Sequence, residues 1–242
     1  MKLKFKEQME SGLSELGLLL KQEQIDQFYQ YYQLLIEWNK VMNLTAITEI
    51  EDVVTKHFLD SISLSKIIDN IDTASFSLID VGTGAGFPGI PLKIVFPKLS
   101  ITLLDSLNKR VKFLKEVITQ IDLDDIHAIH GRAEDYGRNP DYREQFDYCV
   151  SRAVANIATL SEYCIPFIKS GGYFVSYKSG KVDEELTKGK KAISELGGNL
   201  EQVVKFQLAG ANAERSLVLI KKVKKTSGIY PRKAGLPGKE PI

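Results

Sequence analysis

Hydrophobic residues recur along this chain at two different spacings, and the spacing changes near residue 70. From Leu3 to Leu20 and from Glu23 to Val41, apolar residues return every three or four positions, as on one face of an amphipathic helix. Thr48 and Glu51 have the spacing of a capping box and predict the start of a further helix, which carries the segment KHFLDS. We therefore expect residues 1–70 to form an N-terminal helical extension.

After residue 70, short apolar runs of strand length alternate with segments of helical spacing. Strands are expected at Phe76–Val81, Ile101–Leu104, Ile126–Ile129, Phe146–Val150, Tyr173–Tyr177, Val203–Leu208 and Ser216–Val223. Helices are expected from Pro88 and at Asn108–Ile121, Asn156–Ile168 and Asp183–Leu196, with Gly171 and Gly172 as the turn before the fifth strand. This alternation predicts an α/β, Rossmann-like fold with a mostly parallel seven-stranded sheet. The last two strands, with little between them, predict a hairpin at one edge.

This pattern divides the chain into three parts. The helical extension, 1–70, precedes a ligand-binding α/β unit at 71–225. Residues 226–242 are rich in Pro, Gly and Lys and are expected to form an irregular basic arm.

A glycine-rich turn separates the first expected strand from the helix after it, in the stretch LIDVGTGAGFPGIPL at 78–92. Gly82, Gly84 and Gly86 permit positive φ and remove side chains, so a ligand can lie against the main chain. The free N–H groups at the helix start then face an anionic part of that ligand. The turn therefore predicts a binding site.

Two ligands fit this turn. Read from Gly84, the string GAGFPG satisfies the dinucleotide fingerprint, with Asp105 about 20 residues further on as the ribose-binding acid. Read from Asp80, the string D-x-G-x-G-x-G resembles motif I of class I S-adenosylmethionine (SAM) methyltransferases. A carboxylate at the end of the first strand repels a pyrophosphate but suits the ammonium of a methionine moiety, which favours SAM over NAD. A turn without a ligand is the least favoured alternative, because three alternating glycines cost stability.

Further polar residues follow the other expected strands. Ligands bind open parallel sheets at the carboxyl ends of the strands, where Asp105, Glu134 and Arg152 fall after the second, third and fourth strands. The Asp105 carboxylate offers two acceptors for the two ribose hydroxyls. Ala133 and Glu134 are placed where an adenine would rest, with backbone or carboxylate bound to its exocyclic amine.

Composition narrows the class of protein. The 242 residues are 43% hydrophobic and 26% charged, as in a soluble globular protein, and contain neither a run of 18 apolar residues nor a signal-peptide pattern. Cys149 and Cys164 lie in apolar segments without metal-ligand spacing, which indicates core packing, no metal site and a reducing, cytoplasmic setting. The net charge is only +1, but from Lys221 onward seven Lys and Arg residues face one acid. Such a basic tail favours nucleic-acid contact, with a solubilising tail as the alternative.

Several motifs together resemble one family. DVGTGAGFPGIPL, LLDSLNKRVKFL, GRAEDY and VSRAVA resemble the RsmG (GidB) family of bacterial 16S ribosomal RNA guanine-N7 methyltransferases. NKVMNLT and KHFLDS upstream and the tail PRKAG-PGK-P extend the resemblance over nearly the whole chain. One departure is KSG at 178–180, where the family has Lys followed directly by Gly, and this leaves the role of Lys178 open.

The resemblance implies a site and a substrate. SAM would be held by Gly82, Gly84, Phe87, Asp105, Ala133 and Glu134, with Arg152 lining the site; the motif itself adds Asp80 and Gly86. Candidate positioning residues are Arg152, His57 and Asn39, and candidate RNA contacts are Asn43, Lys178, Arg232 and Lys233. The target would be a guanine in the decoding-region loop of 16S rRNA in the small ribosomal subunit. Nothing in the sequence demands more than a monomer.

The expected chemistry needs no general base. No N/D-P-P-Y/F motif follows the fourth strand, and Cys149 has no preceding Pro, so the devices for methylating exocyclic amines and cytosine C5 are missing. Guanine N7 carries a free lone pair and no proton, so catalysis reduces to in-line placement of N7 and the methyl group. A cation on N7 would hinder the reaction, and Arg152 is therefore expected at the O6 edge, a phosphate or the cofactor. The rival functions are an NAD-dependent oxidoreductase and a non-catalytic ribosome-binding protein.

Overall fold

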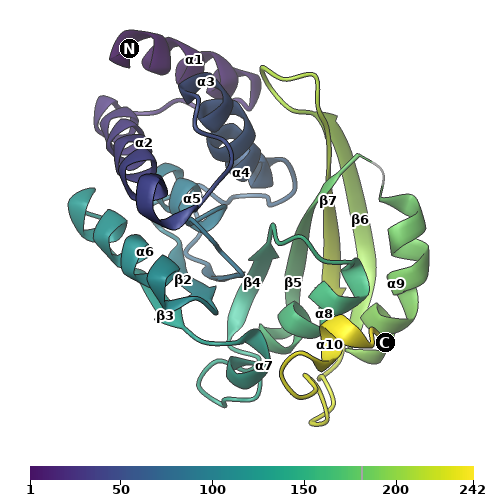
Figure 1. The fold of residues 1–242 in the computed structure, drawn as a ribbon. Helices are drawn as coiled ribbons and strands as arrows, with labels where there is room; N and C mark the ends of the chain where they lie inside the picture. Colours follow the sequence, from purple (N-terminus) through teal and green to yellow (C-terminus); the bar gives the residue numbers. More distant parts are fainter. Residues whose placement is uncertain (181) are drawn as a thin grey trace.

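The computed structural model describes residues 1–180 and 182–242. Its centre is a seven-stranded sheet of order β3-β2-β1-β4-β5-β7-β6 (Figure 1). The strands are β1 (Ser77–Val81), β2 (Ser100–Asp105), β3 (Ile126–His130), β4 (Phe146–Ser151), β5 (Ile168–Ser179), β6 (Gly198–Gln207) and β7 (Glu214–Lys222). Strands β1 to β5 pair in parallel, and β7 is antiparallel to both β5 and β6. The mostly parallel sheet and the edge hairpin are confirmed.

Helices cover both faces of the sheet. One hydrophobic cluster joins it to α1 (Lys2–Glu15), α2 (Gln22–Met42), α5 (Gly89–Val95) and α6 (Asn108–Gln120), and a second joins it to α8 (Ile157–Cys164) and α9 (Asp183–Glu195). Phe5 and Phe28 of the N-terminal helices lie in the same cluster as Phe113 of α6, and all three are at most 1% exposed. The helical extension therefore shares a core with the sheet. Among the described residues, no helix has the length and apolar character to cross a membrane.

Helix α1 ends at Glu15, so the prediction of a helix to Leu20 is wrong by five residues. Gly17 has φ +70°, and its N–H donates to Ser14 O at 3.0 Å while Leu18 N donates to Leu13 O at 2.9 Å. These two bonds form a Schellman cap, which requires one residue in the left-handed conformation, and glycine adopts this conformation without steric cost. The apolar periodicity continues past this glycine, but the helix does not.

The KHFLDS segment lies in one continuous helical stretch of changing pitch. It comprises α3 (Ile50–Val53), a π-helical turn (Val54–Leu59), α4 (Asp60–Ile62) and a 3₁₀ turn (Ser63–Lys66). The predicted capping box does not form, because the N-cap is Glu49 and no side chain caps the helix. A π turn rotates the residues after it relative to a regular helix and is frequent at functional sites. Here the turn carries His57.

The pair Gly171–Gly172 lies within β5, so the prediction of a turn before the strand is wrong. Strand β4 pairs with β5 at Phe146 and Ile168, and after a register shift the pairing resumes at Tyr148 and Tyr173. The two glycines lie between these pairs, in a bulge of the ladder. A Cβ on Gly172 would lie 2.5 Å from a backbone oxygen of β4. Correspondingly, α8 ends at Cys164 and a 3₁₀ turn (Ile165–Phe167) replaces the rest of the predicted helix.

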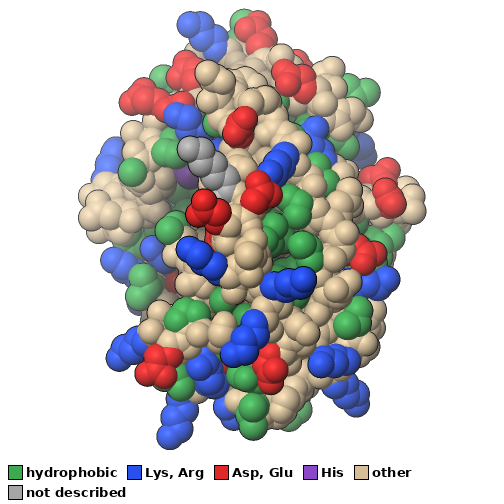
Figure 2. All heavy atoms as spheres, turned by 90° about the vertical axis from the view of Figure 1, so that its right-hand side faces the viewer, with side chains coloured by type: hydrophobic (Ala, Val, Ile, Leu, Met, Phe, Trp, Pro, Cys, Tyr) green, Lys and Arg blue, Asp and Glu red, His purple; other side chains and the backbone are tan. Residues whose placement is uncertain are grey.

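Residues 226–242, here called the C-terminal strap, lie against the body of the protein. The strap carries α10 (Leu236–Lys239) and runs across α7 (Ala133–Tyr136) and α8 (Figure 1). Its Tyr230 is only 8% exposed. The prediction of an irregular arm is therefore correct in secondary structure apart from α10, but the segment is packed. Figure 2 shows the face on the α9 side, where basic and acidic side chains alternate and basic ones are more frequent toward the lower end.

Candidate active site

Two adjoining cavities lie at the carboxyl ends of the strands, where strand order reverses between β1 and β4. The first has a volume of about 750 Å³ and the second about 320 Å³. Both are lined by Ala153, Val154 and Ala155, the segment that follows β4. Among the expected cofactor contacts, Arg152 lines the first cavity, whereas Gly82, Ala133 and Glu134 line the second.

The three glycines of the turn have different surroundings. Gly82 is exposed and Gly84 half-buried, and a Cβ on Gly84, which has φ +63°, would meet open space. Gly86 is buried with φ +98°, and a Cβ there would lie 2.7 Å from the Tyr31 hydroxyl. The first two glycines leave room for a ligand. Gly86 instead permits close packing against α2, and its role as a ligand contact stays a prediction.

Asp80 is a structural residue of the turn. Its side chain is 0% exposed, and its Oδ2 accepts hydrogen bonds from Thr83 Oγ1 at 2.6 Å and Gly89 N at 2.9 Å. Burial raises the pKa of Asp80 from 3.8 to about 7, although both hydrogen bonds oppose this rise. Its carboxylate lines neither cavity, so the prediction that it contacts the ammonium of the cofactor is not supported.

Asp105 fixes the turn from the second strand. Its Oδ2 accepts from Gly84 N at 2.9 Å and its Oδ1 from Leu107 N at 2.8 Å, and Arg110 lies 3.4 Å from Oδ2. The side chain is only 3% exposed. Asp105 itself lines neither cavity, although its chain neighbour Ser106 lines the second.

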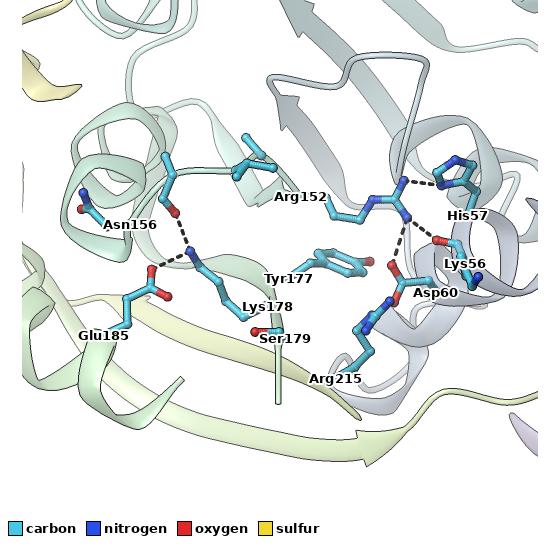
Figure 3. Close-up of a pocket in the computed structure, with 13 residues that line it drawn as sticks. Lys56, His57, Asp60, Arg152, Asn156, Tyr177, Lys178, Ser179, Glu185 and Arg215 are labelled. Atoms are coloured by element: carbon cyan, nitrogen blue, oxygen red, sulfur yellow. Dashed lines mark hydrogen bonds and ion pairs between the residues drawn. The ribbon is translucent and has the colours of Figure 1, made fainter. Parts of the chain in front are cut away.

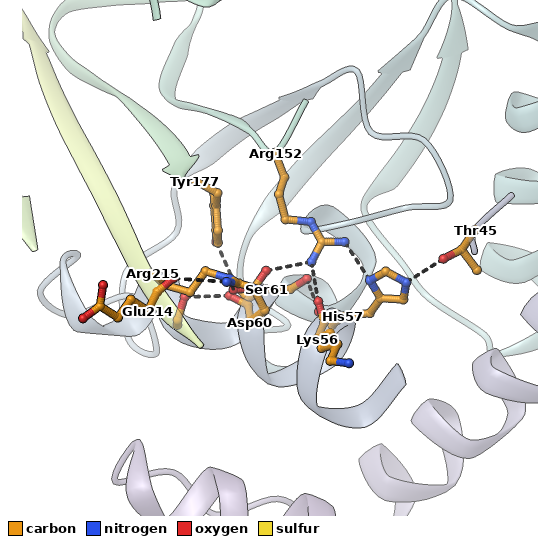
Figure 4. Close-up of polar contacts among 10 residues, drawn as sticks. Thr45, Lys56, His57, Asp60, Ser61, Arg152, Tyr177, Glu214 and Arg215 are labelled. Carbon is orange, nitrogen blue, oxygen red and sulfur yellow. Dashed lines mark hydrogen bonds and ion pairs between the residues drawn. The ribbon is translucent and has the colours of Figure 1, made fainter. Parts of the chain in front are cut away.

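Arg152 is the centre of a polar network in the first cavity (Figure 4). Its Nη1 donates to Lys56 O at 3.1 Å and Asp60 Oδ2 at 3.0 Å, and its Nη2 donates to His57 Nδ1 at 3.1 Å. The guanidinium carbon lies 5.0 Å from the centroid of the Phe87 ring, on which His57 also stacks at 4.5 Å. Phe87 is therefore the apolar floor beneath the network rather than a wall of either cavity.

His57 is neutral and has both nitrogens engaged. Because a guanidinium only donates, Nδ1 must be the acceptor, and Nε2 therefore carries the proton and donates to Thr45 Oγ1 at 2.9 Å. Burial, assisted by the charge of Arg152, lowers the pKa of His57 from 6.5 to about 3. His57 thus orients Arg152 and has no free lone pair with which to accept a proton.

Asn39 and Asn43 lie at the end of α2. The Asn39 amide donates to Thr45 O at 3.0 Å and accepts from Thr45 N at 2.9 Å, so Asn39 acts on His57 through Thr45. Asn43 is the C-cap of α2 with φ +49° and is exposed. The first is thus a supporting residue, and the second remains open to a partner.

The expected RNA contacts differ in their accessibility. Lys178 Nζ donates to Ala155 O at 2.5 Å and Glu185 Oε1 at 2.6 Å, on the side of the first cavity opposite Arg152 (Figure 3). Arg232 forms an ion pair at 2.6 Å with the buried Glu162. Lys233 is exposed. Lys178 and Arg232 are engaged within the protein, whereas Lys233 is exposed, and the RNA contacts of all three stay predictions.

Two charged residues of this network were not among the predicted site residues, namely Asp60 and Arg215. Asp60 bridges two cations, since its Oδ1 accepts from Arg215 Nε at 3.1 Å while its Oδ2 accepts from Arg152. The presence of Asp60 in KHFLDS was a usable signal. Arg215 had none, because it comes from β7, far along the chain, and reaches the site only through folding. Among residues 1–180 and 182–242, no group of three or more metal-ligating side chains gathers at a possible metal site.

The strand order and the cavities at its switch point define the class I SAM-methyltransferase fold. A putative sarcosine dimethylglycine methyltransferase from Galdieria sulphuraria superposes with a TM-score of 0.57 at 14% identity, over 84% of this chain and 99% of that one. TYW2 from M. jannaschii, solved in complex with AdoMet, gives 0.52 at 14% identity, over 68% and 77% of the two chains. The protein thus has the fold of a methyltransferase.

The sequence identifies the family within this class. The profile of the GidB family, described as rRNA small subunit methyltransferase G, matches residues 24–218. A Ribosomal RNA small subunit methyltransferase G from Lachnoclostridium phytofermentans is 56% identical over 231 residues, 96% of this chain and 95% of the relative. Another from Acetivibrio thermocellus is 51% identical over 240 residues, 99% and 98% of the two chains. The chain belongs to the GidB family, so the methyltransferase interpretation of the glycine turn holds over the dinucleotide one.

Proposed function

We propose that this protein transfers the methyl group of SAM to N7 of a guanine in the decoding-region loop of 16S rRNA. Family membership supports a small-subunit rRNA as the substrate, since the relatives carry that name. The charge of the first cavity supports it as well. Its lining includes Lys56, Arg152, Lys178 and Arg215 against two carboxylates, so the cavity is net positive and suits a polyanion.

The second cavity fits the adenosine part of SAM. Gly82 exposes its main chain there, Gly84 leaves a space that a Cβ would enter, and Ala133 and Glu134 form the wall after β3. Asp105 accepts from Gly84 N and would thereby fix the turn against which the cofactor lies. SAM supplies an electrophilic methyl group on a sulfonium. The residues of this chain hold and orient the two reactants and exclude water.

One observation carries the choice of N7: among the described residues, 1–180 and 182–242, every acid–base group that lines the first cavity is already engaged. Asp60 is paired with two arginines and Glu185 with Lys178. His57 has both nitrogens in hydrogen bonds and a pKa of about 3. Tyr177 donates to Ser61 O at 2.7 Å, and burial raises its pKa well above 10.0. A site with no available base suits a nucleophile that arrives without a proton, as guanine N7 does.

Arg152 suits the positioning of the base. Three acceptors fix its guanidinium at the floor of the cavity, so it can bind a purine oxygen or a phosphate without rearranging. We place it at the guanine O6 edge or a phosphate rather than at N7, because a cation on N7 would oppose the positive charge that the purine acquires.

The test is methyl transfer from labelled SAM to small-subunit particles purified from a strain that lacks this protein. Digestion of the RNA should yield 7-methylguanosine from a single guanine. Label on another base would refute the N7 assignment, and no label on particles or free RNA would refute the substrate.

A pair of variants tests the cofactor site in the same assay. Gly84→Asp places a carboxylate in the open space of the glycine turn and should abolish SAM binding and methyl transfer. Gly228→Asp is the matched control, because a Cβ on Gly228 also meets open space but belongs to the strap and not to the glycine turn. Equal activity of the two variants would contradict the cofactor assignment.

A further inference from the structure

The C-terminal strap is fastened to the protein mainly through its backbone. Arg143 donates to the carbonyls of Thr226 at 2.8 Å, Ser227 at 3.1 Å and Tyr230 at 2.8 Å, and Arg138 to those of Ile229 at 3.0 Å and Pro231 at 2.7 Å. Guanidinium groups that bind successive carbonyls fix the course of a chain that has no regular structure of its own. The strap is therefore a defined structural element.

A buried ion pair holds the middle of the strap. The Arg232 guanidinium donates to both oxygens of Glu162 on α8, at 2.6 to 3.1 Å, and the Arg232 backbone N donates to Oε1 at 2.7 Å. The Glu162 side chain is 1% exposed. A bidentate pair of this kind fixes direction as well as distance. Arg232 thus acts as a latch between the strap and α8.

Past this latch, the strap reaches the second cavity. Thr159 Oγ1 on α8 donates to Pro237 O at 3.0 Å and so holds the strap a second time. Between Arg232 and Pro237, Gly235 N donates to Glu134 Oε1 at 2.7 Å. Gly235, which has φ +83°, is itself part of the cavity lining, opposite Gly82. The strap therefore forms part of the cavity wall and contacts Glu134, another residue of this wall.

The contact with Gly235 orients the carboxylate of Glu134. Its Oε1 is taken by the strap, whereas none of the described residues donates a hydrogen bond to Oε2. The Glu134 side chain is otherwise buried, with 6% of its surface exposed. A carboxylate fixed through one oxygen presents the other in a defined direction, and that oxygen can accept from the exocyclic amine of a purine.

We propose that the strap is an integral part of the cofactor site and that Arg232 is a positioning residue for it. Arg232 holds the strap on α8, the strap holds Oε1 of Glu134 through Gly235, and Oε2 is thereby aimed at the adenine amine. The strap begins after the segment 24–218 that the family profile matches. The inference rests on the proposed function, because it takes the second cavity as the adenosine site.

The experiment compares the binding of two probes by calorimetry, S-adenosylhomocysteine and its N6,N6-dimethyl analogue, which has no amine hydrogen. Wild-type protein should bind the analogue about tenfold more weakly or worse, because a site built to accept a hydrogen bond rejects a ligand that cannot donate one. Arg232→Met alone would leave a buried carboxylate without its cation and could unfold the protein. The variant of choice is therefore Arg232→Met with Glu162→Gln.

The double variant should bind S-adenosylhomocysteine about tenfold more weakly than wild type, and its preference for this probe over the analogue should fall to about twofold. Lys169→Met is the matched control, because it also removes the cation of an ion pair, the 2.5 Å contact with Asp147, but far from the cavity. It should leave both affinities unchanged. Thr159→Val removes only the bond to Pro237 O and should lower the preference in the same direction by about twofold, which keeps the test valid if the double variant does not fold.

The outcomes separate the two proposals. Unchanged affinities in the Arg232 and Thr159 variants overturn the role of the strap. Weaker binding of both probes with the wild-type preference also overturns it, since general loosening of the fold affects both probes equally. Failure of the wild-type protein to bind S-adenosylhomocysteine overturns the proposed function instead.

Discussion

The buried carboxyl group of Asp80 should make the stability of this protein fall between pH 5 and pH 8. The folded pKa of Asp80, about 7, lies above its ordinary value of 3.8. Between these two values the folded protein holds a proton that the unfolded chain has released. Rising pH therefore favours the unfolded chain, until the slope levels off above the folded pKa.

The size of this effect follows from the shift. Between its two pKa values the group changes the free energy of unfolding by about 1.4 kcal/mol per pH unit, which amounts to about 2 to 3 kcal/mol from pH 5 to pH 8. Asp80→Asn removes the titration but keeps an acceptor for Thr83 Oγ1 and Gly89 N. Its amide N–H groups lie where Oδ1 finds no hydrogen-bond partner among the described residues of the wild type, so the variant should be less stable at pH 5 by about 1 to 3 kcal/mol.

The assay is urea unfolding followed by circular dichroism at half-unit steps from pH 5 to pH 8. The difference in unfolding free energy between wild type and Asp80→Asn should shrink or change sign as the pH rises. Asp147→Asn is the control, because hydrogen bonds and the charge of Lys169 hold the pKa of Asp147 below 3.8, outside the tested window. Parallel curves for wild type and Asp80→Asn would refute the reasoning.

Three further predictions concern the site. Because His57 is neutral with a pKa of about 3, the rate of methyl transfer at saturating substrates should show no ionisation of this histidine between pH 6 and pH 9; an inflection that His57→Gln removes would contradict this. Gly86→Ala should lower the free energy of unfolding by about 2 kcal/mol or more, from strain at φ +98° and contact with the Tyr31 hydroxyl. Gly84→Ala should lower the free energy of unfolding, measured in the same urea assay, by only about 1 kcal/mol, but should weaken SAM binding more than Gly86→Ala does. The reverse ranking would show that the two glycines are misassigned. Lys233→Ala should weaken RNA binding and reduce the slope of log affinity against log salt by about 1, whereas Lys205→Ala on β6 should not.

Local sequence was sufficient for most elements of the fold. A strand or helix whose apolar spacing is regular can be recognised without its partners, so all seven strands were predicted. Strands β5 and β6, however, begin at Ile168 and Gly198, each five residues before the predicted start. The errors fall where a local signal has two meanings. Gly17 ends a helix in spite of continuing apolar periodicity, whereas Gly171 and Gly172 lie in a strand bulge although two glycines usually indicate a turn.

The chemistry of the site depended more on the fold. The glycine turn and the residues after each strand were evident in the sequence, because parallel strands bring their carboxyl ends to one edge. The orientation of each side chain was not evident in the sequence. Asp80 lines neither cavity, because its carboxyl group is buried within the turn, where it accepts from Thr83 Oγ1 and Gly89 N.

Contacts across long stretches of chain were decided only by the tertiary structure. Asp60 and Arg215 meet because the N-terminal helices share a core with the sheet, and nothing near either residue indicates the pair. The composition of the strap predicted an irregular basic arm, but only the fold pairs Arg232 with a buried carboxylate on α8 and the backbone of Gly235 with Glu134. The sequence alone thus determined which elements form and where the glycine turn and the ends of the parallel strands lie, since both follow from local spacing. The fold decided which charges are paired, because pairing depends on which residues burial brings together.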